Sequence, residues 1–525
     1  MCRRRAVRER GRTRSFHGRQ SRAPPCFTIR TEDVLARARE ASLDGSVSII
    51  LTAPTHGATR STPSELIARA RSAGARSVEM IRDTTDQVPL VPVLPTPGRV
   101  ESERTVSGVS AFDWTLSNGM RVILKPTRFL YDDIELRVVG PGGASLARDE
   151  DYPSAYLADR VIGSTGVGPL NGTRLGRRLN GTSIELEISV DNDAIGMNGS
   201  AAPRDLETFL QLIHLYFTAP RADTVAFRRY YERSTSYARG RESNPDAQFS
   251  DSVAAIVSQH HARALPVERR RIGEVRLSKA LEFWTARAAN AAGFTVVLTG
   301  DFTLDRVRPL VVRYLASLPA GTGEQPRDVG LRFPSGITRR RLVAGMAPRA
   351  RTQLVFSGPY NGSNEMTDDL GAVADVLELA LTDRLRERLG GTYGARVSSS
   401  VNLVPPATYM MTVDFETAPE RTDSLVAAAL EEIDRLRTRG PSDDEVAKTR
   451  EARKRDRDGD LESNNYWANE LSWHARMGWP LATIADHQND VLRMSKANLQ
   501  AAARAYLKPS DYVEVTMMPK GKATP

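Results

Sequence analysis

The stretch Arg351-Thr-Gln-Leu-Val-Phe-Ser-Gly-Pro359 is an apolar strand that ends in Gly-Pro, and it repeats the pattern of Glu135-Leu-Arg-Val-Val-Gly-Pro141 about 218 positions earlier. A helical pattern follows each of them at a similar offset, at 154–162 and at 368–381. One strand–helix order that occurs twice over about 200 residues predicts a tandem duplication. The expected fold class is therefore α+β, with two tandem homologous domains, each an antiparallel sheet packed with helices.

The pattern of apolar residues fills in both repeats. Asn118-Gly119 lies between two apolar runs and predicts a β-hairpin with a type I′ turn over 114–125. The remaining strands are expected at 134–139, 183–190, 194–199, 294–301, 351–359, 395–401, 409–415 and 512–517. Helices are expected at 154–162, 205–217, 222–239, 278–291, 304–315, 368–381, 421–437, 442–455, 467–478 and 496–507.

Composition divides the chain into five segments. Residues 1–26 are rich in arginine and are expected to be a disordered leader. Residues 27–95 predict helices at 32–41 and 64–73 and a strand at 46–52, too little to close a core, and we expect a partial remnant of a preceding α+β domain. A proline-rich, polar stretch predicts a linker at 96–111. The two complete domains are then expected at 112–325 and 326–525.

The charge distribution argues against a nucleic-acid-binding protein. The net charge is +9, yet residues 1–25 alone hold nine arginines and a single acid, Glu9. A basic arm of this kind could bind phosphate or anionic lipid, but the rest of the chain is close to neutral. No apolar run is long enough for a transmembrane helix, and no apolar segment typical of a secretory signal is present. Cys2 and Cys26 cannot build a disulfide framework.

The segment Arg386-Glu-Arg-Leu-Gly-Gly-Thr-Tyr393 carries the strongest functional signal. Arg386 and Tyr393 place a cation and a phenolic donor on one short connection, a pair that suits a peptide carbonyl or an oxyanion. Gly390 and Gly391 let a ligand backbone approach closely. The residues alone leave a second interpretation open. In it the arginine pairs with an acid on its own helix, the glycines end that helix, and the tyrosine merely precedes a strand.

Three stretches resemble landmarks of the pitrilysin/insulinase-type zinc peptidases: LSNGMRVILKPT at 116–127, TVVLTGDFTLDRVRPLVVRYLASLP at 295–319 and RERLGGTYG at 386–394. The resemblance extends over about 110–520 and is strongest to bacterial periplasmic single-chain members. It implies four homologous α+β domains in two halves that close on each other, with the C-terminal half on this chain. It also implies a periplasmic location, although no signal peptide is visible.

The zinc site of that family is an inverted His-x-x-Glu-His motif on a helix. The equivalent positions here are Tyr156, Asp159 and Arg160, so that a tyrosine and an arginine stand where the two histidines would be. Neither is an ordinary zinc ligand, and Arg160 would bring a permanent positive charge to the place of a dication. We therefore expect no metal on this chain and zinc only on a catalytic half.

The seven histidines offer no replacement site. His260 and His261 are adjacent, so on a helix their side chains diverge by about 100°. His214 lies in an apolar helix and is expected to be a core imidazole. His474 follows Trp473 in a region that the resemblance places near the substrate chamber, so that it is either a substrate contact or a packed residue.

The resemblance implies that Tyr393 stabilises the oxyanion, that Arg386 grips a substrate carbonyl or carboxylate, and that Gly390, Gly391 and His474 contact the peptide. The expected function is the substrate-binding, non-catalytic C-terminal half of an insulinase-type zinc endopeptidase, inactive in peptide hydrolysis when alone. Its expected partners are a peptide and a His-x-x-Glu-His half, either in trans or upstream in the same gene, with no nucleic acid and no membrane span. The alternative is a non-enzymatic scaffold or assembly subunit with the same fold.

Overall fold

The computed structural model describes residues 30–40, 48–52, 61–74, 76, 88–486, 491 and 493–521. The chain divides into two units, 1–83 and 84–525. The described part of the first unit contains two helices, α1 (Thr31–Glu40) and α2 (Pro63–Gly74), which confirm the two helices expected there. Within the described ranges, no helix combines the length and the apolar character needed to cross a bilayer.

The strand expected at 46–52 is not confirmed. Residues 48–52 are exposed and have no strand structure, and residues 46 and 47 lie outside the described residues. An apolar run becomes a strand only when a neighbouring strand satisfies its backbone groups. No such neighbour occurs among the described residues of this unit.

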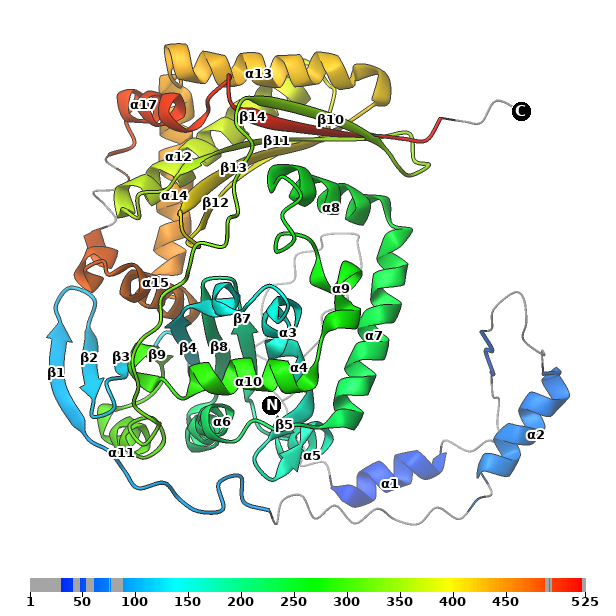
Figure 1. Cartoon of the computed structure of the whole chain (residues 1–525), viewed down its shortest axis with the longest axis vertical. Helices are drawn as coiled ribbons and strands as arrows, with labels where there is room; N and C mark the ends of the chain where they lie inside the picture. The colour runs from blue at the N-terminus through cyan, green and yellow to red at the C-terminus, as the bar shows by residue number, and fades with distance from the viewer. Residues whose placement is uncertain are drawn as a thin grey trace, which may run out of the picture. The chain divides into compact units, whose positions relative to one another are not determined.

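A seven-stranded sheet forms the centre of the first repeat (Figure 1). Its order is β1-β2-β3-β9-β4-β8-β7, and every pairing is antiparallel except that of β3 with β9. The strands are β1 (Val100–Val106), β2 (Ala111–Leu116), β3 (Arg121–Pro126), β4 (Ile134–Pro141), β7 (Glu185–Val190), β8 (Ala194–Ala201) and β9 (Thr295–Gly300). The principal helices are α3 (Tyr152–Tyr156), α4 (Ala158–Thr165), α5 (Gly172–Arg178), α6 (Leu206–Thr218), α7 (Thr224–Glu242), α8 (Pro245–Val257), α9 (Val267–Arg270), α10 (Leu277–Ala288) and α11 (Leu304–Tyr314).

A five-stranded sheet forms the centre of the second repeat, in the order β10-β14-β11-β13-β12. Here only the pairing of β10 with β14 is parallel. The strands are β10 (Ile337–Val343), β11 (Ala350–Pro359), β12 (Ala395–Asn402), β13 (Thr408–Thr417) and β14 (Tyr512–Met518). The principal helices are α12 (Asn364–Leu381), α13 (Thr422–Arg439), α14 (Asp443–Asp460), α15 (Asn464–Met477) and α17 (Lys496–Tyr506).

The two sheets share one topology, which confirms the α+β fold class with antiparallel-rich sheets. The order β3-β9-β4-β8-β7 matches β10-β14-β11-β13-β12, strand for strand and in the direction of each pairing. The Gly-Pro landmarks fall at the ends of the equivalent strands β4 and β11. A duplication explains this agreement, because unrelated sheets would not share five positions and one parallel pair.

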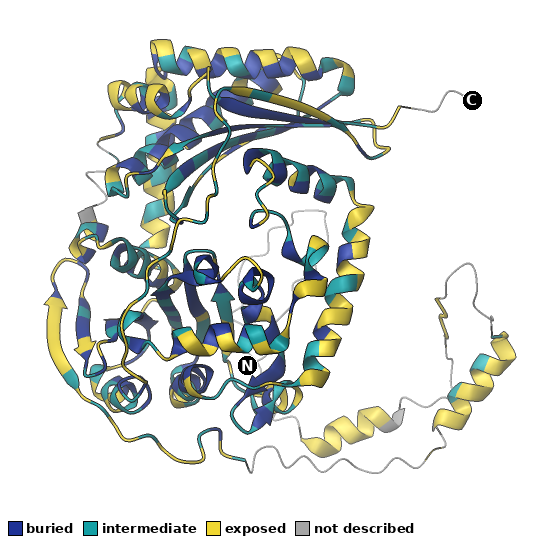
Figure 2. Cartoon of the chain, in the orientation of Figure 1, coloured by how far each residue is buried: buried dark blue, intermediate teal, exposed yellow. Residues whose placement is uncertain are grey.

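Each repeat also supplies one helix to the sheet of the other repeat. Helix α8 packs Phe249 against the second sheet, and α15 packs Trp467 and Leu471 against the first. At the start of α15 the buried Asn464 side chain accepts a hydrogen bond from the Thr127 hydroxyl at 2.5 Å. The strand residues that receive these helices are Ala111, Ile123 and Val297 in the first sheet and Val355, Val513, Val515 and Met517 in the second. Figure 2 shows the inner strands of both sheets as largely buried, whereas the outer strand β1 is exposed.

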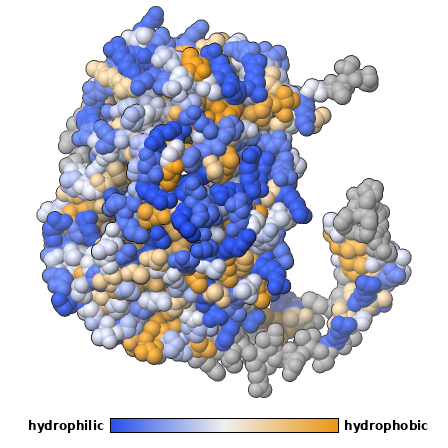
Figure 3. All heavy atoms as spheres, in the orientation of Figure 1, coloured by the Kyte–Doolittle hydropathy of each residue, from blue (hydrophilic) through white to orange (hydrophobic). Residues whose placement is uncertain are grey.

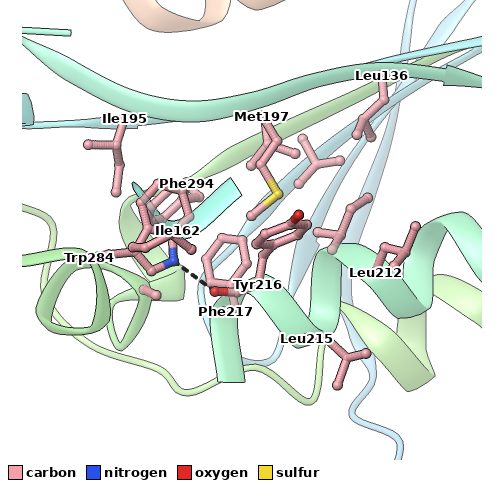
Figure 4. Close-up of a cluster of buried hydrophobic side chains, with 14 of the residues drawn as sticks. Leu136, Ile162, Ile195, Met197, Leu212, Leu215, Tyr216, Phe217, Trp284 and Phe294 are labelled. Atoms are coloured by element: carbon pink, nitrogen blue, oxygen red, sulfur yellow. Dashed lines mark hydrogen bonds between the residues drawn. The ribbon is translucent and has the colours of Figure 1, made fainter. Parts of the chain in front are cut away.

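The core of the first repeat lies between its sheet and α4, α6 and α10. Figure 4 shows Met197 and Ile195 from β8 facing Phe217 of α6 and Phe294. Phe217 and Phe294 meet edge to face, with ring centroids 4.9 Å apart. The Trp284 indole N–H donates to the carbonyl oxygen of Tyr216 at 2.8 Å, so the one polar atom of this side chain is satisfied within the core.

Three local expectations need correction. The predicted linker at 96–111 contains β1, because an outer strand tolerates polar side chains on both faces. The 118–119 turn is not type I′: only Gly119 has positive φ, at 85°, and the Asn118 amide instead donates to the carbonyl oxygens of Leu315 and Leu318. The helix predicted at 154–162 is interrupted at Leu157, which separates α3 from α4.

Candidate functional site

The segment Arg386–Tyr393, called the clamp segment from here on, lies between α12 and β12. Helix α12 continues as one π-helical turn, Thr382–Arg388, which contains Arg386. Tyr393 lies two residues before β12, the outermost strand of the second sheet. The structure therefore places both residues on the helix-to-strand connection that the sequence predicts.

The two glycines of this connection end the helix. The N–H of Gly390 donates to the carbonyl oxygen of Arg386, and the N–H of Gly391 to that of Leu385, each at 3.0 Å. Gly390 has φ of +56°, the left-handed conformation common after helix ends. A Cβ added to Gly391 would stand 2.5 Å from Cδ1 of Leu425. Both glycines are thus required by the fold, and this helix-ending role is compatible with a role at the site.

Two long side chains hold the ends of the connection. Arg421, the residue before α13, donates from Nη2 to the carbonyl oxygen of Leu389 at 2.9 Å and from Nη1 to that of Gly390 at 3.2 Å. At the other end, the N–H of Val397 in β12 donates to Oε2 of Glu378 at 2.7 Å. Sequence reasoning missed Arg421 and Glu378, because no local motif connects them to a segment that they reach only in the folded chain.

Tyr393 is displayed on the surface. Its side chain is 97% exposed, and its hydroxyl forms no hydrogen bond within the described structure. The residues beside it are fixed, because Thr392 Oγ1 donates to the carbonyl oxygen of Gly394 at 2.9 Å and accepts from its N–H at 3.3 Å. A free phenolic O–H on a fixed backbone is a suitable donor for a ligand oxygen.

Arg386 is held only weakly. Its Nε lies 3.3 Å from Oε1 of Glu387, and these two side chains are 56% and 61% exposed. Surface ion pairs of this kind contribute about 0–1 kcal/mol, so a ligand carboxylate or carbonyl can replace Glu387 at little cost. The pairing of Arg386 within its own helix is therefore real, and it does not exclude a binding role.

His474 is separate from this connection. It lies on α15, which packs on β4 and β9 of the first sheet. Its imidazole is buried, meets the Trp479 ring edge-on at 5.2 Å, and places Nδ1 3.3 Å from the carbonyl oxygen of Pro480. A peptide would reach this ring only if the packing opened, so the structure favours the packed alternative for His474.

The positions of the zinc motif have other partners. Tyr156 stacks on Tyr152 with ring centroids 5.6 Å apart. The exposed guanidinium of Arg160 forms an ion pair with Glu268, and Asp159 accepts from the backbone N–H of Arg160 at 2.7 Å. Burial raises the pKa of Asp159 to about 6.

These residues do not fit a zinc ion. The break between α3 and α4 at Leu157 disrupts the regular helix on which an inverted motif depends, and the Arg160 cation would repel a dication. Over the residues with described positions, no group of three or more His, Cys, Asp or Glu side chains is arranged to hold a metal.

Part of the chain matches a known protein family. Residues 282–453 match the family described as the peptidase M16 inactive domain. A zinc protease PQQL-like protein of Arabidopsis thaliana is 26% identical over 395 residues, which is 72% of this chain and 39% of the plant protein. The chain thus spans less than half the length of that relative.

Two solved structures share the fold. The periplasmic protease PqqL of Escherichia coli aligns with a TM-score of 0.72 at 19% identity, over 87% of this chain and 51% of that one. A peptidase M16 inactive domain from Pseudomonas fluorescens aligns with a TM-score of 0.66 at 16% identity, over 79% of this chain and 99% of that one. The chain is therefore similar in sequence to the PqqL zinc proteases, shares the fold of about half of the PqqL structure, and matches the peptidase M16 inactive domain over residues 282–453.

Proposed function

We propose that this chain is the substrate-binding, non-catalytic C-terminal half of an insulinase-type zinc endopeptidase. The observation that carries the proposal is the exposed Tyr393 hydroxyl, presented on a connection that Arg421 and Glu378 hold in place. The unsuitability of Tyr156 and Arg160 as metal ligands supports a non-catalytic role for this half. Peptide hydrolysis would then require a half that carries His-x-x-Glu-His.

Within such an enzyme the catalytic half supplies the metal and the water that it activates. The residues of this chain bind and orient the peptide. The Tyr393 O–H donates to the scissile carbonyl oxygen as negative charge develops there, and Arg386 leaves Glu387 to hold a neighbouring carbonyl or a carboxylate of the substrate. The periplasmic protease PqqL suggests the periplasm as the compartment.

A substitution that removes one oxygen tests the role of Tyr393. In a complex of this chain with a catalytic half, Tyr393→Phe should lower turnover by about 10²–10³-fold, while the melting temperature stays unchanged because the side chain is 97% exposed. Tyr131 is 85% exposed, and Tyr131→Phe is the matched control. Unchanged turnover in Tyr393→Phe would remove the assigned role and favour the alternative of a non-enzymatic assembly subunit.

Metal content provides an independent test. After dialysis against excess zinc and gel filtration, the isolated chain should retain no stoichiometric zinc by plasma mass spectrometry. One tightly held ion per chain would contradict the reading of Tyr156, Asp159 and Arg160. The mass of the denatured polypeptide from its source cells then separates the two possible arrangements: a polypeptide well above 57.8 kDa has room for the catalytic half on the same chain, and a polypeptide near that mass requires the catalytic half to act in trans.

A further inference from the structure

Two grooves occupy equivalent places in the two repeats. One has a volume of about 940 Å³ and lies between the end of α4, α5 and the first half of α7. The other, of about 780 Å³, lies between α12 and α14. Arg229, Glu232 and Arg233 of the first groove correspond, about 219 positions later, to Lys448, Glu451 and Ala452 of the second. The duplication therefore supplies an internal comparison for each groove.

The second groove holds more acids than cations. Nζ of Lys448 lies 2.7 Å from Oδ2 of Asp444, and Nε of Arg453 lies 2.5 Å from Oδ2 of Asp375. Its lining contains the three cations Lys448, Arg453 and Arg455 and the four acids Asp375, Glu378, Glu451 and Asp456, so it offers no net positive charge to a ligand. The fold of the repeat can therefore place acidic side chains beside the cations of this groove.

The first groove does not neutralise its cations. Arg174, Arg229 and Arg233 line it, and none of their side chains forms an ion pair or a hydrogen bond within the described part of the chain. Two acids also line it: Glu232, which lies between Arg229 and Arg233 on α7, and Asp223, the N-cap of α7, whose Oδ1 accepts from the N–H groups of Val225 and Ala226 at 3.0 and 2.9 Å. Three guanidiniums thus face a hollow that holds two carboxylates, which leaves the groove with a net positive charge.

The surroundings are accessible. Arg229 and Arg233 are four residues apart on α7, so they lie on one face of the helix. Figure 2 shows α7 as exposed along much of its length, and Figure 3 shows a mostly hydrophilic surface over the region where Figure 1 places this helix. Gly163, Gly172 and Ala226 also line the groove, which has a volume of about 940 Å³.

We propose that this groove binds an acidic segment of a polypeptide, with its carboxylates held by Arg174, Arg229 and Arg233. Guanidinium groups bind carboxylates in bidentate geometry, and they form stronger hydrogen bonds with ionised acceptors than with neutral ones. The inference rests on the proposed function, because a protease half meets polypeptides, and it adds a substrate class: proteins that carry an Asp- or Glu-rich stretch.

A polypeptide fits better than a nucleic acid. Asp223 and Glu232 also line the groove, and their carboxylates would repel the closely and regularly spaced phosphates of a nucleic-acid strand. A polypeptide can place neutral backbone beside these acids and its own carboxylates beside the arginines. The presence of both signs of charge in the groove therefore favours a ligand whose charges lie on flexible side chains.

Photocrosslinking of the full chain tests the proposal locally, so that binding to the arginine-rich residues 1–25 is counted separately. The probe is a peptide of about twelve alternating Glu and Gly residues that carries a benzophenone. Mass spectrometry should locate adducts on α5 and α7, and Arg229→Gln with Arg233→Gln should reduce their yield about tenfold. Lys448→Gln with Arg455→Gln removes the same charge from the second groove and should leave that yield unchanged.

Several results would overturn the proposal. Equal loss in both double variants would show general charge attraction. A single-stranded oligonucleotide that displaced the peptide at lower concentration and crosslinked to the same helices would identify a nucleic-acid site. If the arginine variant failed to fold, the unmodified chain would be compared with a Lys-Gly probe, and equal yields of the two probes on α7 would count against the site.

Failure of the proposed function can be distinguished from failure of the groove proposal. Tyr393→Phe should leave the adducts on α5 and α7 unchanged. If it abolished them while the arginine variant did not, the acidic peptide would occupy the clamp, and this inference would fall while the proposed function stood. If the adducts depended on the arginines but Tyr393→Phe left turnover intact, the groove would stand without the clamp.

Discussion

Nη1 of Arg421 donates a hydrogen bond to the carbonyl oxygen of Gly390 across 3.2 Å, and this bond ties the start of α13 to the turn that presents the clamp tyrosine. A helix leaves its last carbonyl groups without partners inside the helix. Arg421 satisfies two such groups in adjacent residues, so it fixes the direction in which the chain leaves α12. It is a positioning residue, because it acts through the backbone.

Arg421→Gln should loosen the connection. A shortened amide cannot reach both carbonyls, and the loss of one to two hydrogen bonds costs about 1–2 kcal/mol locally. We expect the N–H groups of Gly390 and Gly391 to exchange with deuterium about tenfold faster, measured at residue resolution. Arg396→Gln removes another exposed arginine nearby and should leave this exchange unchanged. Equal exchange rates in Arg421→Gln and the unmodified chain would show that the turn is fixed without Arg421.

The two neighbouring glycines give a matched pair for testing the packing of the connection. Gly391→Ala should destabilise the protein by about 1–3 kcal/mol, because the new methyl group would stand 2.5 Å from Leu425. Gly394→Ala meets nothing within 4 Å and should change the free energy of unfolding by less than about 0.5 kcal/mol. Urea unfolding followed by circular dichroism measures both. Similar values for the two variants would contradict the close contact between α13 and the turn.

Asn464 tests the exchange of helices between the repeats. Its buried amide donates to Oδ2 of Asp133 at 2.8 Å and accepts from the Thr127 hydroxyl at 2.5 Å. Asn464→Ala leaves these partners of the first repeat without their bonds and should cost about 1–3 kcal/mol. Glu462 is exposed two residues earlier, and Glu462→Ala should stay within about 0.5 kcal/mol. If α15 were only loosely attached to the first sheet, calorimetry would give similar melting temperatures for the two variants.

The sequence predicts those elements whose signal is local. The apolar strands β4, β9 and β11 and helix α12 occur where periodicity places them. Strand β10 was missed because Ile337-Thr-Arg-Arg-Arg-Leu-Val343 looks like a charged surface loop, and only its pairing with the distant β14 makes it a strand.

The contrast between local signals and contacts of residues far apart in sequence also explains the missed helix and the candidate site. Helix α8 has most of its apolar residues in its second half and so lacks a regular apolar face along its length, and its Phe249 packs against the other repeat. The clamp segment was predicted because its residues are consecutive. Arg421 and Glu378 were not, because hydrogen bonds between residues far apart in sequence leave no periodic trace. The arginine groove was also missed, since it depends on the absence of ion pairs that only the folded chain can show.

Asp159 stands where the zinc motif has its glutamate. Burial raises its pKa from 3.8 to about 6, so the folded protein binds this proton more tightly than the unfolded chain does. The stability that this group contributes is present below about pH 4 and is lost as the pH rises through 6. Above that pH, burial of the carboxylate carries its full cost.

Asp159→Asn removes this titration and keeps an oxygen that can accept from the Arg160 N–H. Relative to the unmodified protein, the variant should gain no stability at pH 4 and about 1–3 kcal/mol at pH 7, measured by urea unfolding. Asp328→Asn is the control, because the change in stability with pH should have the opposite sign there. Its hydrogen bonds with Arg332 lower its pKa to about 2, so Asp328→Asn should lose stability as the pH rises. A difference for Asp159→Asn that stayed flat between pH 4 and 7 would mean that water reaches the carboxylate, and the position would then be open enough to reconsider as a ligand site.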